Sequence, residues 1–231
     1  MRDFLRRMFA LFLAICGIFS VFTIKSAAVG VYRSVSLDPE KKQIALTFDD
    51  GPHPRLTLEI LSILQEYGVK ATFFMIGENA RNYPEAARAV AAAGHEIGNH
   101  TEHHLHLSSL NEEGLLKELS ACKNSIFSVC GVKPALFRPP EGAATQTVLR
   151  CAERFSYPVI LWSIDTKDWE VKNAGKIADS VLSGIKPGAI ILMHDYVGKN
   201  SKTPEALRRI LPKLIEEGYE FVTVSELLGF G

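Results

Sequence analysis

The chain has 231 residues, of which 47% are hydrophobic and 23% charged, and its formal net charge is zero. A chain of this length and composition can bury a sizeable core, so we expect one globular domain plus an N-terminal segment. The balanced charge gives neither the basic excess of a nucleic-acid-binding protein nor the acidic runs of a disordered one. We therefore expect no nucleic-acid partner.

The first 30 residues have the layout of an export signal. Arg2, Arg6 and Arg7 precede an uncharged, mostly apolar run over residues 8–24, and small residues follow at 26–28. This pattern predicts either a signal peptide that is cleaved after the small residues or a membrane anchor that is retained. The apolar run would span about 26 Å as a helix, against about 30 Å for a bilayer core, so its length leaves both readings open. In either case we expect an exported protein with its domain outside the membrane, extracellular, in the cell wall or anchored.

From residue 42 onward, predicted strands alternate with predicted helices. Helical spacing of apolar residues, with Pro84 and Asn111 at helix starts and Gly68, Gly94 and Gly131 after helix ends, marks the helices. The predicted helices lie around residues 58–64 and over 84–93, 112–130, 145–155, 174–185 and 203–217. Apolar runs predict strands over residues 43–48, 71–76, 96–99, 136–138, 158–164, 189–193 and 221–224. About seven strands alternating with helices favour an α/β fold, an incomplete or distorted (β/α) barrel of parallel strands over residues 40–227.

Three cysteines fall within this predicted domain. Cys122, Cys130 and Cys151 are odd in number, and no two of them have the spacing of a metal site. At most one disulfide could form among them, and we expect all three to be small buried hydrophobic residues.

Polar residues follow the ends of the predicted strands. Asp49 and Asp50 end the first strand, and two carboxylates this close repel unless a cation or hydrogen bonds compensate. His100 follows the third strand and His194 follows the sixth. In a (β/α) barrel the carboxyl ends of the strands share one rim, where active sites are built. We therefore expect residues that are scattered over some 145 positions of the chain to meet in one site.

A histidine cluster predicts a metal site. Residues 100–106 contain four histidines, and His100 and His104 are four residues apart, so both imidazoles can reach one ion from a single helical turn. One carboxylate completes a set of two histidines and one aspartate, which leaves coordination positions open for water and substrate. His103 and His106 are interpreted as solvated loop residues.

Five segments of the chain resemble, in order, the five motifs of the NodB-like polysaccharide deacetylases, carbohydrate esterase family 4. They are Thr-Phe-Asp-Asp-Gly-Pro at 47–52, His-Thr-Glu-His-His at 100–104, Arg-Pro-Pro-Glu-Gly at 138–142, Asp-Thr-Lys-Asp-Trp at 165–169 and Leu-Met-His at 192–194. The likeness covers roughly residues 40–227, and the fold of that family is a distorted (β/α) barrel.

The resemblance implies a metal site and a catalytic base. By likeness to the family, Asp50, His100 and His104 bind one divalent ion, which would lower the pKa of bound water and polarise a carbonyl. The donor set suits Zn²⁺, and also Co²⁺, Ni²⁺ or Mn²⁺. Asp49 resembles the general base, and Arg138 resembles the partner that keeps this base ionised and fixes its direction.

The resemblance also implies a catalytic acid and a binding pocket. His194 matches the general acid, and Asp165 matches the carboxylate that partners it and raises its pKa. The neighbouring Asp168 is interpreted as a loop carboxylate. Trp169 and Leu192 match residues that shape an apolar pocket for the acetyl methyl, with core packing as the alternative interpretation.

The third motif departs from the family at one position. Members commonly carry an aromatic residue after the two prolines, and here Glu141 follows Pro140. The backbone N–H at this position, which the family uses to hold the oxyanion, is still present in Glu141. The carboxylate could repel an anionic substrate, read a cationic one, or point to solvent.

The sequence thus predicts an exported, metal-dependent hydrolase that removes N-acetyl groups from a polysaccharide. Peptidoglycan, through its N-acetylglucosamine or N-acetylmuramic acid, is the favoured substrate, and chitin oligomers come second. The alternatives are an O-acetyl xylan esterase, because the same site can attack an ester carbonyl, and a catalytically silent wall-binding domain.

Overall fold

The computed structural model describes residues 30–196, 198 and 200–230. The expected export segment, with its apolar run at 8–24, lies outside this part of the chain. Within the described residues, no helix combines the length and the apolar character that a membrane crossing requires. The three domain cysteines are free: Cys122 and Cys151 are buried and Cys130 is half-buried.

The described chain alternates strands and helices, as expected from its sequence. The strands are β1 (Val31–Tyr32), β2 (Gln43–Asp49), β3 (Thr72–Met75), β4 (Glu96–Asn99), β5 (Val159–Ile160), β6 (Ile164–Asp165), β7 (Ile190–His194) and β8 (Glu220–Val222). The helices are α2 (Leu56–Glu66), α3 (Gly77–Asn82), α4 (Pro84–Ala92), α5 (Glu112–Cys130), α6 (Gln146–Arg154), α7 (Ala174–Leu182), α8 (Thr203–Glu216) and α9 (Val224–Leu227).

The strands form a distorted, incomplete barrel of parallel pairs. One sheet has the order β4-β3-β2-β7-β6, with β8 paired to the first residues of β2, and a small second sheet joins β1 to β5. Phe137 connects the two sheets through single parallel bridges to Asn99 of β4 and Val159 of β5. The pairing therefore runs round from β5 to β6, which follow one another in the chain, and the circle is interrupted between them.

Two predicted strands differ from the observed ones. The run at 136–138 forms only the bridges at Phe137, and the run at 158–164 divides into β5 and β6. The physical reason is that β5 pairs toward Phe137 while β6 pairs with β7, so the intervening residues must bend from one neighbour to the other. The helix caps were predicted correctly at α5, where the Asn111 side chain accepts the Gly114 N–H and Gly131 ends the helix at φ 70°.

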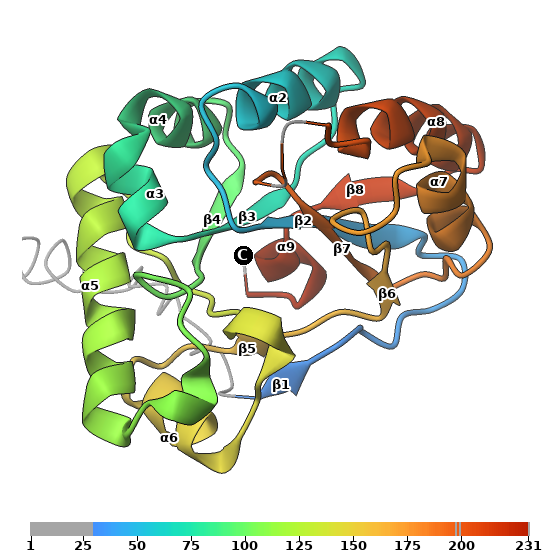
Figure 1. Ribbon diagram of the computed structural model, residues 1–231. Coiled ribbons are helices and arrows are strands. Elements are labelled where there is room, and N and C mark those ends of the chain that lie inside the picture. Colours follow the sequence, from blue (N-terminus) through green and yellow to red (C-terminus); the bar gives the residue numbers. More distant parts are fainter. Residues whose placement is uncertain (1–29, 197, 199, 231) are drawn as a thin grey trace, which may run out of the picture.

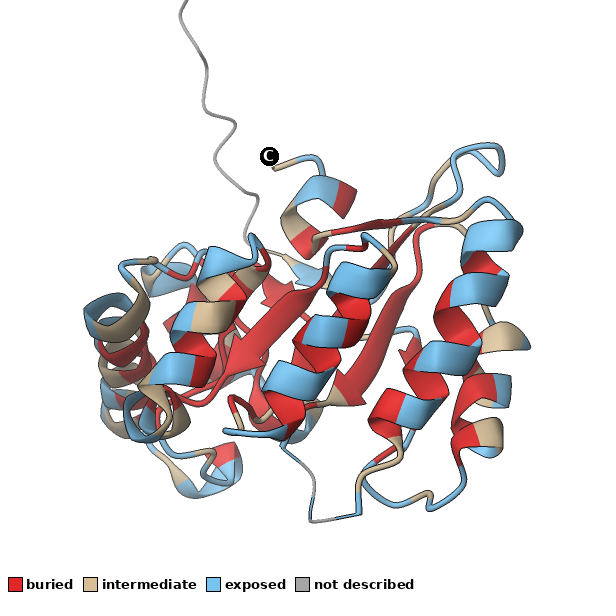
Figure 2. Cartoon of the chain, turned by 90° about the horizontal axis from the view of Figure 1, so that it is seen from above, coloured by how far each residue is buried: buried red, intermediate tan, exposed pale blue. Residues whose placement is uncertain are grey.

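Alternation along β2 explains how the barrel is filled. Ile44, Leu46 and Phe48 face outward and pack with residues of α2 and α8 in the main hydrophobic cluster. Ala45 belongs instead to an inner cluster, in which Leu227 of α9 packs with residues of several strands. The helices surround the strands on most sides (Figure 1), and their buried faces turn toward the sheet (Figure 2). This alternation directs Asp49, at the end of β2, toward the interior.

Candidate active site

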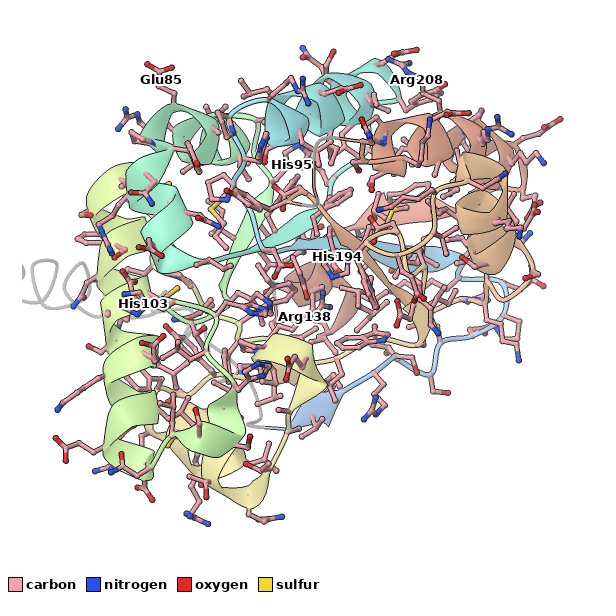
Figure 3. The ribbon with its side chains drawn as sticks, in the orientation of Figure 1. Glu85, His95, His103, Arg138, His194 and Arg208 are labelled. Atoms are coloured by element: carbon pink, nitrogen blue, oxygen red, sulfur yellow. The ribbon has the colours of Figure 1, made fainter. Side chains whose placement is uncertain are left out.

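A cleft of about 680 Å³ opens where the carboxyl ends of the strands converge. Its walls contain most of the residues that the sequence singled out, from β2, the loop after β4, the 3₁₀ turn Pro140–Gly142, the loop after β6, and β7 with the loop after it. These include the predicted base, the predicted metal ligands and His194. Figure 3 shows Arg138 and His194 projecting toward the centre of the molecule, whereas Glu85 and Arg208 lie on its outer surface.

Asp49 and Arg138 form a buried ion pair on the floor of this cleft. The Arg138 Nη1 atom lies 2.7 Å from Asp49 Oδ1, and the two residues are 4% and 0% exposed. Burial lowers the pKa of Arg138, whereas the charge of Asp49 raises it. The pair is compensated by further hydrogen bonds, because Arg138 also donates to the Thr47 hydroxyl and to the carbonyls of Ile160 and Leu161. The guanidinium holds Asp49 Oδ1, and Asp49 Oδ2 lies 3.8 Å from His100 Nε2, another residue of the cleft lining.

Asp50, His100 and His104 form a cluster that could hold a metal ion. Their ligand atoms all lie within 4.8 Å of one another. Asp50 Oδ1 is 3.3 Å from His100 Nε2 and 3.2 Å from His104 Nε2. Asp50 has φ 74° and His104 has φ 51°, the left-handed region that non-glycine residues adopt at a cost of about 1–3 kcal/mol. This backbone directs the Asp50 carboxylate away from Asp49 and toward the two imidazoles.

The donor set fits a divalent cation. The His100 Nδ1 atom lies 2.7 Å from the Arg138 carbonyl oxygen, which can only accept, so Nδ1 carries the proton and Nε2 presents a lone pair. That lone pair faces Asp50 Oδ1, a buried carboxylate oxygen without a hydrogen-bond partner. Acceptor atoms that converge in this way require a cation between them.

Asp168, rather than Asp165, is the partner of His194. The His194 Nδ1 atom lies 2.7 Å from Asp168 Oδ1, and Asp168 Oδ2 accepts the His194 backbone N–H and the Thr203 hydroxyl. Asp168 is 1% exposed, so its interpretation as a loop carboxylate was wrong. The assignment of Asp165 to this role was also wrong, because its side chain is exposed and its Oδ1 accepts the backbone N–H of Lys167, capping the loop.

The environment of His194 favours its protonated form. Burial would lower the pKa of the imidazole, but the hydrogen bond and charge of Asp168, with the charges of Asp49 and Asp50, raise the pKa to about 9. His194 also lines the cleft. It can therefore donate a proton from Nε2 to a group bound there at neutral pH.

The predicted substrate-binding residues are only partly brought together. Leu192 is buried and Trp169 is 51% exposed, and both line the cleft together with Trp162 and Tyr196, which the sequence did not single out. Pro140, the first residue of the 3₁₀ turn, is buried and does not line the cleft.

Glu141 reaches the cleft with an exposed carboxylate. Its Oε1 lies 2.9 Å from His106 Nδ1, so these two side chains are in contact at the rim. Glu141 has φ 58°, a left-handed conformation, and lines the cleft.

Sequence reasoning also missed a buried carboxylate behind the first motif. Asp195 is 1% exposed, its backbone N–H donates to the Asp49 carbonyl, and its Oδ2 accepts the Thr57 hydroxyl at 2.5 Å. Burial raises the pKa of Asp195 to about 7. A Cβ atom at Gly51 would lie about 2.1 Å from this carboxylate, so only glycine fits there. The sequence signal that could have found Asp195 was its position directly after His194, the predicted acid.

Comparisons with known proteins agree with this geometry. The family model for polysaccharide deacetylase matches residues 36–160. A peptidoglycan-N-acetylglucosamine deacetylase from Bacillus cereus is 42% identical over 201 residues, which cover 86% of this chain and 94% of the relative. The deacetylase PgdA from Listeria monocytogenes is 39% identical over 188 residues, which cover 81% of this chain but only 39% of that longer protein.

A solved structure shares the fold. The crystal structure of the Bc1960 peptidoglycan N-acetylglucosamine deacetylase superimposes with a TM-score of 0.81 at 34% identity, covering 86% of this chain and 92% of that one. The resemblance to the family is thus confirmed over the greater part of the chain. The protein belongs to the polysaccharide deacetylase family, the NodB-like carbohydrate esterases of family 4.

Proposed function

We propose that the protein is a metal-dependent N-deacetylase that hydrolyses the acetamido group of N-acetylglucosamine units in peptidoglycan. One observation carries this proposal: a buried carboxylate held by Arg138, an imidazole held by Asp168 and a convergent metal-ligand triad all line one cleft. These are the three requirements of amide hydrolysis by water, which needs a proton acceptor, a proton donor for the amine and polarisation of the carbonyl. The relatives that are named peptidoglycan-N-acetylglucosamine deacetylases support N-acetylglucosamine as the sugar.

The metal site would be formed by Asp50, His100 and His104. A divalent cation bound there supplies a Lewis acid that acidifies water and polarises the acetyl carbonyl. Two imidazoles and one carboxylate suit Zn²⁺, with Co²⁺, Ni²⁺ or Mn²⁺ as alternatives. The residues present fit this ion, because the His100 Nε2 lone pair and Asp50 Oδ1 lie 3.3 Å apart, and Asp50 Oδ1 has no hydrogen-bond partner among the described residues.

The chain's own residues would move the protons. Asp49 takes one proton from the attacking water through Oδ2, since Oδ1 is held by Arg138. The new bond joins the water oxygen to the acetyl carbon, and the bond from this carbon to nitrogen breaks. His194 delivers its proton to the departing nitrogen, and Asp168 stabilises the imidazolium until then. The products are acetate and the free amine of glucosamine.

The cleft walls would select the acetyl group and the sugar. Leu192 is buried at the cleft wall and offers an apolar surface to the methyl, and the exposed Trp169 offers a ring face to the sugar. The backbone N–H of Glu141 is the candidate oxyanion donor.

We further propose that the protein acts outside the membrane. Its predicted export segment and the extracellular location of peptidoglycan both support this. Fractionation of cells that express the full chain would test it, with N-terminal sequencing to distinguish cleavage near residue 28 from anchoring through residues 8–24. Recovery in the cytoplasmic fraction would contradict export.

Acetate release decides the function. We expect the purified protein to release acetate from peptidoglycan, more slowly from chitin oligomers and least from acetyl-xylan, and to stop when a chelator removes the metal. Acetate mainly from acetyl-xylan would indicate the esterase alternative. Sedimentation with cell walls without any acetate, also in the presence of added metal, would indicate a silent binding domain.

A further inference from the structure

The loop that carries both histidine ligands is held by many hydrogen bonds. It follows β4 over residues 100–104, and Thr101 and His104 have φ 66° and φ 51°. Left-handed residues of this kind keep their conformation only when their surroundings impose it. His100 and His104 can therefore share one ion only while neighbouring elements hold the loop between them.

Helix α3 and strand β4 hold one side of the loop. The N–H groups of Gly77 and Glu78, at the start of α3, donate to the carbonyls of Thr101 and Glu102 over 3.0 Å each. The Asn99 side chain, at the end of β4, accepts the Thr101 N–H at 2.9 Å.

Glu118 of α5 holds the other side. Its Oε2 accepts the backbone N–H groups of Glu102 and His103 at 3.0 and 2.9 Å, and its Oε1 lies 2.8 Å from His103 Nδ1. Glu118 is 8% exposed, and a carboxylate is buried to this extent only when hydrogen bonds compensate. These three contacts use both of its oxygens, and all of them go to the histidine loop.

The other acidic residue of the loop has separate partners. The Glu102 carboxylate contacts Arg81 and the Ser125 hydroxyl, so its partners differ from those of the Glu118 carboxylate. The loop is thus fixed by two independent carboxylates, one projecting from the loop and one from α5.

We propose that Glu118 is a positioning residue that holds the loop in its metal-binding conformation and thereby sets the affinity for the ion. It touches neither the ion nor the substrate, and it acts by accepting two backbone N–H groups between the two ligands. This inference rests on the metal site proposed above. Removal of groups that orient metal ligands typically weakens affinity about 10- to 100-fold.

The test measures metal affinity in metal-free protein by competition of Zn²⁺ with a chromogenic chelator. We expect Glu118→Ala to weaken binding about 10- to 100-fold. Glu118→Gln should stay close to the wild type, because its amide oxygen can accept the same two N–H groups. Glu113→Ala is the matched control on the same helix, because the Glu113 carboxylate is exposed and pairs with Lys117 on the surface. It should bind Zn²⁺ as the wild type does.

Melting temperature with and without Zn²⁺ separates positioning from general stability. Binding to the folded state stabilises it according to the ratio of ligand concentration to Kd, so weaker binding must shrink the metal-induced rise. We expect that rise to shrink in Glu118→Ala. An equal loss of melting temperature with and without Zn²⁺, at unchanged Kd, would show a purely structural role.

Further outcomes keep the inference open to refutation. If Glu118→Ala does not fold, Glu118→Asp replaces it, because the shorter carboxylate keeps the charge but loses reach to both N–H groups, and wild-type affinity in that variant overturns the proposal. A Glu118→Gln variant as weak as Glu118→Ala also overturns it. Absence of Zn²⁺ binding in the wild type would refute the metal site itself, whereas unchanged binding in a folded Glu118→Ala would refute only the role of Glu118.

Discussion

The floor and the rim of the cleft are built in different ways. On the floor, Asp49, Arg138 and Asp168 are at most 4% exposed, and their polar atoms are tied to residues far away in the sequence. At the rim, Glu141 and Trp169 are more than half exposed, and the Glu141 carboxylate lies against His106, which is more exposed still. The floor is therefore fixed by the fold, and the rim is free to vary.

This difference separates chemistry from selection. A group that must transfer a proton needs a defined position, and burial among hydrogen-bonded partners provides it. A group that contacts a sugar chain needs only to be accessible. Substitutions on the floor should therefore change metal content or rate, whereas substitutions at the rim should change the preference among substrates.

The largest effect should come from the metal ligands. We expect about one divalent ion per chain in the wild type and its loss in His100→Ala and His104→Ala, with activity falling to background. His103→Ala and His106→Ala are the controls from the same loop, and both should keep the ion because their imidazoles contact Glu118 and Glu141 instead. Elemental analysis of the four variants checks this. Full metal retention in His100→Ala would remove His100 from the ligand set.

The next effect distinguishes the two adjacent carboxylates. Asp49→Asn keeps the shape but removes the basicity, so it should retain the metal and lose about 10²- to 10⁴-fold in rate, the range of a general base. This corresponds to about 3–5 kcal/mol of barrier. Asp50→Ala removes a ligand, so part of its lost activity should return at high metal concentration.

A metal titration of the deacetylation rate checks both variants. Added metal should leave Asp49→Asn unchanged, because its ion was never lost. Rescue of Asp49→Asn but not of Asp50→Ala would reverse the two roles.

A smaller and pH-dependent effect should appear at Asp168. His194 must be protonated to act as an acid, so activity falls as pH rises through its pKa of about 9. Asp168→Asn removes the main group that raises this pKa, so the alkaline limb of the pH–rate profile should move toward the ordinary histidine value of about 6.5. The loss should be about 10- to 100-fold above pH 8 and smaller near pH 6. Asp165→Asn, at the end of β6 and three residues before Asp168, is the matched control and should leave the limb in place. The reverse result would restore Asp165 as the partner.

The smallest effect should occur at the rim. Glu141→Tyr removes a carboxylate from the cleft lining, and we expect the ratio of rates on peptidoglycan and chitin oligomers to change about threefold to tenfold, less than the effect of a lost buried charge. The melting temperature should change little, because the side chain is exposed. The same ratio of rates in the wild type and in Glu141→Tyr would show that the carboxylate is only solvated.

The sequence predicted the order of strands and helices and the location of the site at the carboxyl ends of the strands, because both depend on local pattern. Apolar runs and glycines after helix ends are local signals, and the rule that parallel strands end on one side placed Asp49, His100 and His194 together. It could not distinguish Asp165 from Asp168, because which of two aspartates three residues apart turns inward depends on the loop conformation. Glu118 was missed because its partners are backbone groups of a distant loop, which leave no pattern in the helix.

Arg138 serves both halves of the catalytic floor through different atoms. Its side chain holds Asp49, while its main-chain carbonyl accepts the His100 Nδ1 proton. Every amino acid has this carbonyl, but only arginine has this guanidinium. A replacement such as Arg138→Met would therefore free the base and still leave the imidazole oriented, giving a protein loaded with metal but nearly inactive. A measurement of bound metal would therefore not detect the loss of activity caused by a substitution at Arg138.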